Sequence, residues 1–235
     1  QHAATLGYNF IIKTRIEGKS PMRLLTKQEC QQEAEPMFEQ VFITCELFYI
    51  DGFCFRPEIT SRTIIYPFYQ DFELPTLEAI VTAAMNLGDT GCYLRNFYAS
   101  TQECEYSHVS LSEFKLLYSD EYIPEELPEK VLKFLQGFDP SFLIGSIYSE
   151  TGKWGIWRWD GGFGILGGPQ EFLAEIRQSV PDIDRQVYAL LRELKNSRLL
   201  SPNSTVLTWL PRLLNHLYGS EVAERILEDI RTGSL

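Results

Sequence analysis

The spacing of apolar residues along the chain changes near residue 169. Before this point, short runs rich in β-branched and aromatic residues indicate strands, whereas after it apolar residues recur at helical spacing. We therefore predict an α+β fold, in which an antiparallel sheet is covered by helices and the C-terminal third of the chain is helical. The simplest arrangement places these helices on one face of the sheet.

A helix and a hairpin are expected in the first 60 residues. Thr26–Glu29 reads TKQE, a capping box that begins a helix, and Pro36 is expected to end it. Residues 41–50 are rich in β-branched and aromatic side chains, and Asp51-Gly52 is a strong turn signal. The pattern predicts a β-hairpin near 41–56.

Further elements follow before residue 119. Residues 63–69 indicate a strand, which Pro67 places at an edge of the sheet because proline cannot donate to a ladder. Residues 75–88 carry one apolar helical face and end in Gly88, a favourable helix C-cap. Residues 91–99 indicate a strand, and residues 111–118 fit either a strand or a helix.

Residues 141–166 predict a three-stranded meander. Strands are expected over 141–148, 153–159 and 163–166, separated by glycine-containing turns. The glycines at 162, 164 and 167 match the G-x-G-x-x-G spacing of dinucleotide-binding loops. That fold requires a second parallel strand after the following helix, and here another helix is predicted instead. The glycines are therefore assigned to tight turns and to close packing of aromatic rings.

The chain after residue 168 has four amphipathic segments. One begins at Pro169, a second spans about 182–195, and Gly219-Ser220 divides the last two. Their leucines are expected to face the sheet, although they could instead form the contact face of a structural subunit in a larger assembly.

The tryptophans of the meander divide by strand alternation. Trp154, Ile156 and Arg158 point to one face and Gly155, Trp157 and Trp159 to the other. Packing in the core is the favoured role. If one face is open, Trp157, Trp159 and Arg158 are the candidate binding residues on this strand.

Composition fits a globular protein with a substantial core. The chain has 235 residues, of which 44% are hydrophobic and 13% aromatic. No apolar run is long enough to span a membrane. Residues 1–21 are interpreted as a leader or an expression remnant, with a native start near Met22. Residues 22–235 are predicted to form one α+β domain, with a subdivision near 119–140 as the alternative.

The five cysteines are widely spaced and form no CxxC pair, so neither a zinc ribbon nor a disulfide scaffold is expected. We interpret them as reduced, buried thiols of a cytoplasmic protein with a bacterial-type surface. No motif indicates a cofactor or a metal ion.

The net charge of −11 is concentrated in the first two thirds of the chain. Residues 22–168 contain 22 acidic and 10 basic side chains, which disfavours nucleic acid and favours a basic protein partner. The densest acidic segment is expected to belong to the docking surface, through Asp120, Glu121, Glu125, Glu126 and Glu129. The leading hypothesis is a non-enzymatic, protein-binding inhibitor or immunity-type protein.

An enzyme that acts on a small molecule is the main alternative. Its pocket would lie between the sheet and the C-terminal helices. Cys104, Glu105 and His108 lie close together in the sequence, and Arg158 could bind an anionic group. These residues form no established catalytic motif, so no catalytic residue is assigned.

Overall fold

A single antiparallel sheet is the centre of the computed structural model, which describes residues 22–43, 54–68, 74–96, 106–114, 144–159, 162–197, 199–200 and 206–232. Within these residues, seven strands follow the order β1-β4-β3-β5-β6-β7-β2, and every neighbouring pair is antiparallel. The strands are β1 (Met22–Leu24), β2 (Ser61–Ile65), β3 (Gly91–Asn96), β4 (Tyr106–Ser110), β5 (Ile144–Ser149), β6 (Gly155–Trp159) and β7 (Phe163–Gly168). The predicted α+β class and antiparallel sheet are confirmed.

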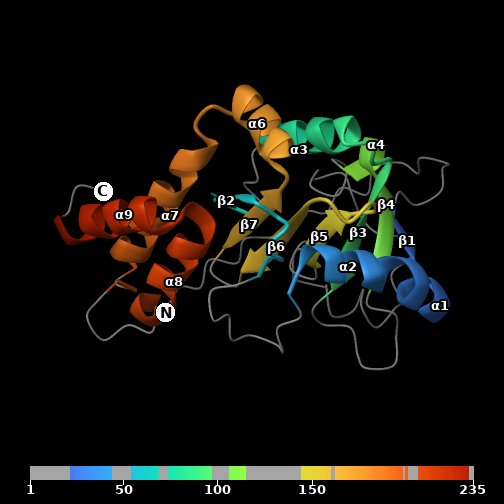
Figure 1. Cartoon of the computed structure of the whole chain (residues 1–235), viewed down its shortest axis with the longest axis horizontal. Coiled ribbons are helices and arrows are strands. Elements are labelled where there is room, and N and C mark those ends of the chain that lie inside the picture. Colours follow the sequence, from blue (N-terminus) through green and yellow to red (C-terminus); the bar gives the residue numbers. More distant parts are fainter. Residues whose placement is uncertain are drawn as a thin grey trace, which may run out of the picture.

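Helices cover both faces of this sheet, so the expectation that they cover one face is wrong (Figure 1). On one face lie α3 (Leu74–Asn86), α4 (Leu111–Phe114), α6 (Gln170–Ser179) and the 3₁₀ turn η4 (Ile183–Arg185). On the other lie α1 (Lys27–Glu29), the π-helical turn η1 (Cys30–Ala34), α2 (Glu35–Val41), α7 (Gln186–Asn196), α8 (Val206–Tyr218) and α9 (Ser220–Thr232).

Two hydrophobic cores result, because successive side chains of a strand point to opposite faces. On β6, Ile156 packs with α3 and α6, whereas Trp157 packs with the core that α2 and the C-terminal helices share. The sheet therefore has no broad open face among the described residues. The sequence of the meander had left open whether one of its faces is exposed.

The N-terminal helix continues past Pro36, contrary to the prediction. Thr26 and Glu29 form the expected capping box. The helix then widens into a π-helical turn, in which the amide of Glu35 bonds to the carbonyl of Cys30. Proline in a helix lacks a donor and presses on the preceding turn. A wider turn before Pro36 accommodates the ring, and burial of Phe38 and Val41 stabilises the continuation.

The structure describes both ends of the predicted 41–56 hairpin. Phe42 and Phe55 form an antiparallel bridge, and the amide of Ile43 bonds to the carbonyl of Cys54 at 3.1 Å. Residues 44–53, including the Asp51-Gly52 turn, lie outside the described residues. Residues 1–21 and the acidic connection at 119–140 also lie outside them, so the domain assignments stay predictions.

Strand β4 was missed because its sequence, YSHVS, has no clear alternation of polar and apolar residues. It pairs with β3 and β1 and places His108 opposite Tyr93 and Arg23. The undecided segment that follows begins as the short helix α4. Strand β2 lies at an edge of the sheet, as Pro67 indicated.

The glycine-rich meander is confirmed as β5, β6 and β7. Aromatic rings pack directly against the glycines of β7. A Cβ on Gly164 would lie 2.9 Å from the Phe68 ring, and one on Gly167 would lie 2.8 Å from the Phe55 ring. In this structure Gly162 lies in the turn before β7 with φ +78°, and Gly164 and Gly167 lie in the buried strand, where they leave room for aromatic side chains.

The cysteines differ in state. Cys54 and Cys92 are free and buried, as predicted. Cys30 is disulfide-bonded, and its partner is not among the described residues, so the prediction of reduced thiols is wrong for Cys30. Burial raises the pKa of the Cys92 thiol well above its usual value, and the charges of Asp89 and Glu150 add to this.

Candidate functional site

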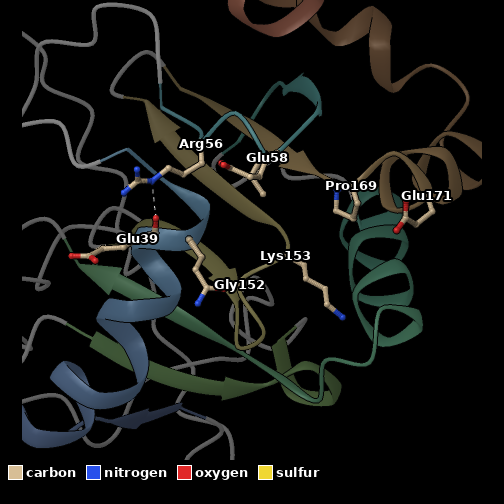
Figure 2. Close-up of a pocket in the computed structure, with 9 residues that line it drawn as sticks. Glu39, Arg56, Glu58, Gly152, Lys153, Pro169 and Glu171 are labelled. Atoms are coloured by element: carbon tan, nitrogen blue, oxygen red, sulfur yellow. Dashed lines mark hydrogen bonds between the residues drawn. The ribbon is translucent and has the colours of Figure 1, made fainter.

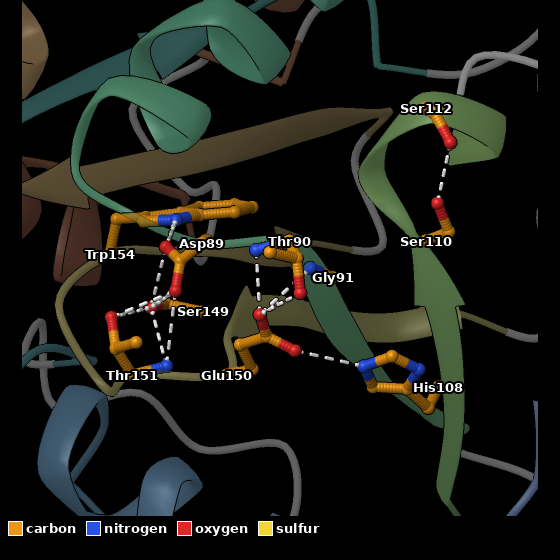
Figure 3. A network of polar contacts seen from close by, with 10 residues as sticks. All are labelled: Asp89, Thr90, Gly91, His108, Ser110, Ser112, Ser149, Glu150, Thr151 and Trp154. Carbon is orange, nitrogen blue, oxygen red and sulfur yellow. Dashed lines mark hydrogen bonds and ion pairs between the residues drawn. The ribbon is translucent and has the colours of Figure 1, made fainter.

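A buried carboxylate holds the turn between β5 and β6. Asp89, which is 3% exposed, follows α3. It accepts hydrogen bonds from the Ser149 hydroxyl at 2.9 Å, the Thr151 amide at 3.2 Å, the Thr151 hydroxyl at 2.8 Å and the Trp154 indole at 2.7 Å (Figure 3). These donors satisfy the carboxylate, as a buried charge requires. The arrangement ties the loop after α3 to the β5–β6 turn.

A second carboxylate, Glu150, extends this connection to β4. It accepts from the Thr90 amide at 2.6 Å, the Thr90 hydroxyl at 2.8 Å and the Gly91 amide at 3.0 Å, and it pairs with His108 Nε2 at 3.1 Å (Figure 3). Burial alone would raise the pKa of Glu150, but these hydrogen bonds lower it to about 2. Glu150 therefore stays charged and fixes the imidazole.

Chemically, a histidine oriented by a carboxylate can act as a base. Its side chain is 28% exposed, but within the described chain no hydrogen bond links His108 to a serine, threonine or cysteine. Ser110 and Ser112 bond to each other instead, at 2.6 Å (Figure 3). The described residues thus supply the orienting pair without a nucleophile.

The two described groups of the enzyme hypothesis, His108 and Arg158, lie on opposite faces of the sheet. His108 pairs with Tyr93 on the face covered by α1 and α2, whereas Arg158 shares the opposite face with Trp154 and Ile156. Cys104 and Glu105 lie outside the described residues. The structure therefore does not assemble His108 and Arg158 into one site.

An open groove of about 520 Å³ lies at the end of the sheet beside α2 (Figure 2). Its walls come from the end of α2, the segment before β2, the β5–β6 turn and the start of α6. The lining residues are Glu39, Gln40, Arg56, Glu58, Ile59, Gly152, Lys153, Pro169 and Glu171. The groove thus lies away from the interface between the sheet and the C-terminal helices, where the enzyme hypothesis placed a pocket.

Three exposed carboxylates flank this groove. The side-chain carboxylates of Glu39, Glu58 and Glu171 have no hydrogen-bond or ion-pair partner among the residues that the structure describes. The two cations of the groove already contact main-chain carbonyls. Lys153 Nζ donates to Leu87 at 2.9 Å, and Arg56 Nε donates to Glu39 at 2.8 Å. The groove therefore offers free acceptors at its margin.

The polar network positions one wall of the groove. Hydrogen bonds of Asp89 and Glu150 fix the β5–β6 turn, and this turn contributes Gly152 and Lys153 to the groove. Gly152 adopts φ +70°, and a Cβ there would lie 2.4 Å from Gln40 Oε1. Glycine therefore permits both the left-handed turn and its contact with α2.

The residues predicted to bind a partner fall into two groups. Asp120, Glu121, Glu125, Glu126 and Glu129 lie outside the described residues. On β6, Arg158 is 6% exposed, while Trp157 packs against Phe38 and Phe42, and the side chain of Trp159 is not described. Their binding roles stay predictions.

Sequence reasoning missed the groove residues altogether. Glu39, Glu58 and Glu171 come from segments far apart in the chain, and each alone reads as an ordinary solvated glutamate. Asp89 and Glu150 do carry a signal, since Glu150 lies in a predicted turn and Asp89 directly follows the predicted helix C-cap Gly88. No pattern showed that these two segments meet.

Comparisons with known proteins add no relative: no protein-family model, curated protein or solved structure matches the chain. Among the described residues, no three histidine, cysteine or acidic side chains cluster as metal ligands would. No described helix has the length and apolar character needed to cross a bilayer. The site must be interpreted from its own geometry.

Acid should destabilise the protein in two separable steps. Burial, helped by the charge of Arg62, lowers the pKa of His216 on α8 from 6.5 to about 4. Stability from the neutral imidazole is complete above pH 6.5 and is lost as pH falls toward 4. Glu150, lowered from 4.5 to about 2, contributes stability that is lost between pH 4.5 and 2. Each step should amount to roughly 1–2 kcal/mol after allowing for partial exposure.

Urea titrations from pH 7.5 to 2.5 measure both steps. His216→Gln should flatten the upper step, and Glu150→Gln the lower one. The exposed Glu224 on α9 supplies the control, because Glu224→Gln should leave the profile unchanged. A His216→Gln profile identical to that of the wild type would contradict the assignment of the upper step.

Proposed function

We propose that this protein is a non-enzymatic, protein-binding protein of the inhibitor or immunity type, which docks a basic partner through an acidic surface. The groove beside α2 is the anchor of that surface. Its flanking carboxylates would receive lysine or arginine side chains of the partner. The acidic segment around 120–129 would add to the same surface.

The observation that carries the proposal is the set of unpartnered carboxylates at the groove. Glu39, Glu58 and Glu171 are exposed beside a concave surface, and the net charge of the chain is −11. Opposite charge on a partner speeds encounter and excludes partners of the wrong sign. Between positions 22 and 168 the chain carries 22 acidic and 10 basic residues, and this excess of negative charge also favours a basic partner.

The two alternatives receive less support. For an enzyme, the structure offers His108 and Glu150 as an oriented pair, but Arg158 lies on the opposite face of the sheet. For a structural subunit that uses the tail helices, most leucines of α7 and α8 are already packed inside the protein, although Leu207 is exposed. Within α8, the buried side chains of Leu210, Leu213 and Leu214 pack in the protein's own core.

The proposed docking does not depend on the compartment. The sequence favours the cytoplasm, where thiols are kept reduced. The disulfide at Cys30 weighs against that location, because disulfides persist mainly in oxidising compartments.

The test reverses the charges of the groove. The triple variant Glu39→Lys, Glu58→Lys and Glu171→Lys should weaken capture of a basic partner roughly 100-fold, since like charges across an interface cost several kcal/mol. Wild-type and variant proteins, immobilised at equal density, are exposed to lysate of the source cells, and bound proteins are identified by mass spectrometry. The affinity for each purified candidate is then measured between 50 mM and 1 M salt.

The matched control places the same charge change elsewhere. Glu78, Glu221 and Glu224 are exposed on α3 and α9, and the triple lysine variant at these positions should keep the partner. The proposal fails if the groove and control variants bind equally. It also fails if the affinity is unchanged at 1 M salt, where charges are screened within about 3 Å.

A further inference from the structure

The two outer strands of a sheet carry backbone groups that a neighbouring strand would otherwise bind. Strand β2 is one of these outer strands, and its inner side pairs with β7 from Ser61 to Ile65. Alternate amides of an antiparallel strand point away from its partner. The amides of Ile64 and Tyr66 therefore mark the outer side of this edge.

Both outward amides have side-chain acceptors. The Ile64 amide donates to the hydroxyl of Tyr218 at 3.1 Å, and the Tyr66 amide donates to Oε1 of Gln186 at 2.9 Å. Tyr218 ends α8 and Gln186 begins α7, beside β2 (Figure 1). The two acceptors come from different helices, but the amides that they bind are two residues apart. A neighbouring antiparallel strand would place its carbonyl acceptors at this same spacing.

Other contacts hold these helices against the edge. The Thr63 hydroxyl donates to Asp184 at 3.1 Å, and Arg177 binds the same carboxylate through Nε at 2.8 Å and a terminal nitrogen at 3.2 Å. The guanidinium of Arg62 donates to the carbonyl of His216 at 2.7 Å. These hydrogen bonds lie on both faces of β2 and fix the positions of Tyr218 and Gln186 beside the strand.

We propose that Tyr218 and Gln186 replace the carbonyls of a missing strand and keep β2 from pairing with β2 of a second copy of this chain. The occupant they exclude is a second copy because antiparallel pairing of two identical strands is self-complementary. In such a pair each copy offers the same amides, with Ile64 near the two-fold axis. Residues 63–65 are Thr-Ile-Ile, β-branched and uncharged, and carry no charge of their own that would oppose such pairing. This role is independent of the acidic docking surface.

Hydrogen exchange tests the first half of the proposal in the unmodified protein. The amides of Ile64 and Tyr66 should be as protected as those in the interior of β3, although they lie at an edge. Tyr218→Phe should speed exchange at Ile64 about fivefold, and Gln186→Leu should do so at Tyr66, since a net hydrogen bond contributes about 1 kcal/mol. Gln186→Glu retains an acceptor and should preserve the protection of Tyr66.

Self-association tests the second half. The double variant Tyr218→Phe/Gln186→Leu should form dimers or larger species whose mass rises with concentration in light scattering. Tyr188→Phe/Gln178→Leu is the control, since the Tyr188 hydroxyl contacts Asp229 and not β2, and Gln178 is exposed on α6. The control should remain at the mass of the wild type.

Three results would overturn the proposal. One is rapid exchange of Ile64 and Tyr66 in the wild type, and another is unchanged exchange in the single variants. The third is a double variant whose edge amides are exposed but which keeps the wild-type mass at every concentration. If the double variant does not fold, the wild-type exchange and the two single variants still decide the matter.

Discussion

Replacing Asp89 with alanine should lower the free energy of unfolding by about 3–5 kcal/mol, the largest effect that we expect of a single substitution. The change removes the acceptor of the exposed Thr151 and leaves two buried donors, the Ser149 hydroxyl and the Trp154 indole, without theirs. Each such donor costs roughly 1–3 kcal/mol, and water that enters the gap recovers part of that. Asp89→Asn should also destabilise, because its amide nitrogen would face other donors.

Urea unfolding followed by tryptophan fluorescence measures this effect, and the Trp154 indole supplies a local signal. Glu78→Gln, an exposed acidic position on α3, is the control and should change stability by less than about 0.5 kcal/mol. A loss below 1 kcal/mol in Asp89→Ala would show that the β5–β6 turn does not depend on this carboxylate. It would also remove the support that we assign to the groove wall.

Gly155→Ala should cost about 1–3 kcal/mol through overpacking alone. A Cβ on Gly155 would lie 2.6 Å from the ring of Phe42 and 2.7 Å from a methyl of Val41. Gly155 does not adopt a positive φ, so the backbone adds no strain to this cost. Equilibrium unfolding of the variant therefore measures how closely α2 approaches the sheet.

A second substitution identifies the steric partner. Phe42→Leu removes the far end of the ring and should recover at least about 0.5 kcal/mol when it is combined with Gly155→Ala. Phe68→Leu is the matched control, because that ring contacts Gly164 and not Gly155. Strict additivity of Gly155→Ala with Phe42→Leu would contradict the packing of this ring on Gly155.

Periodicity alone was sufficient for the helices of the C-terminal third. Residues 182–195 were predicted as one amphipathic helix, and the apolar residues of this segment are buried: Ile183, Val187, Leu190, Leu191 and Leu194. The division at Gly219-Ser220 also matches the boundary of α8 and α9. Such patterns can be read from the sequence because a helix buries the same face whichever surface it packs on.

Other elements depended on their neighbours. The strand β4 contains Ser107 and His108, and only its pairing with β3 and β1 makes it a strand. Pro36 was read as a helix end because its local rule is strong, but the π-helical turn and the burial of Phe38 outweigh that rule. Helices on both faces of the sheet could not be anticipated either, since β4 and β5 contain serines and lack the continuous apolar run that is typical of a strand buried on both faces.

Local sequence patterns therefore predicted the fold class, the meander and the C-terminal helices, because buried positions repeat with the period of each helix or strand. The site does not repeat in this way. Glu39, Glu58 and Glu171 meet at the groove only after the sheet brings α2, the segment before β2 and α6 together. The same holds for the acceptors that close the edge of β2, Tyr218 and Gln186, which lie more than a hundred residues from the amides they bind. Convergence of this kind is a property of the packed chain, and no short stretch of residues encodes it.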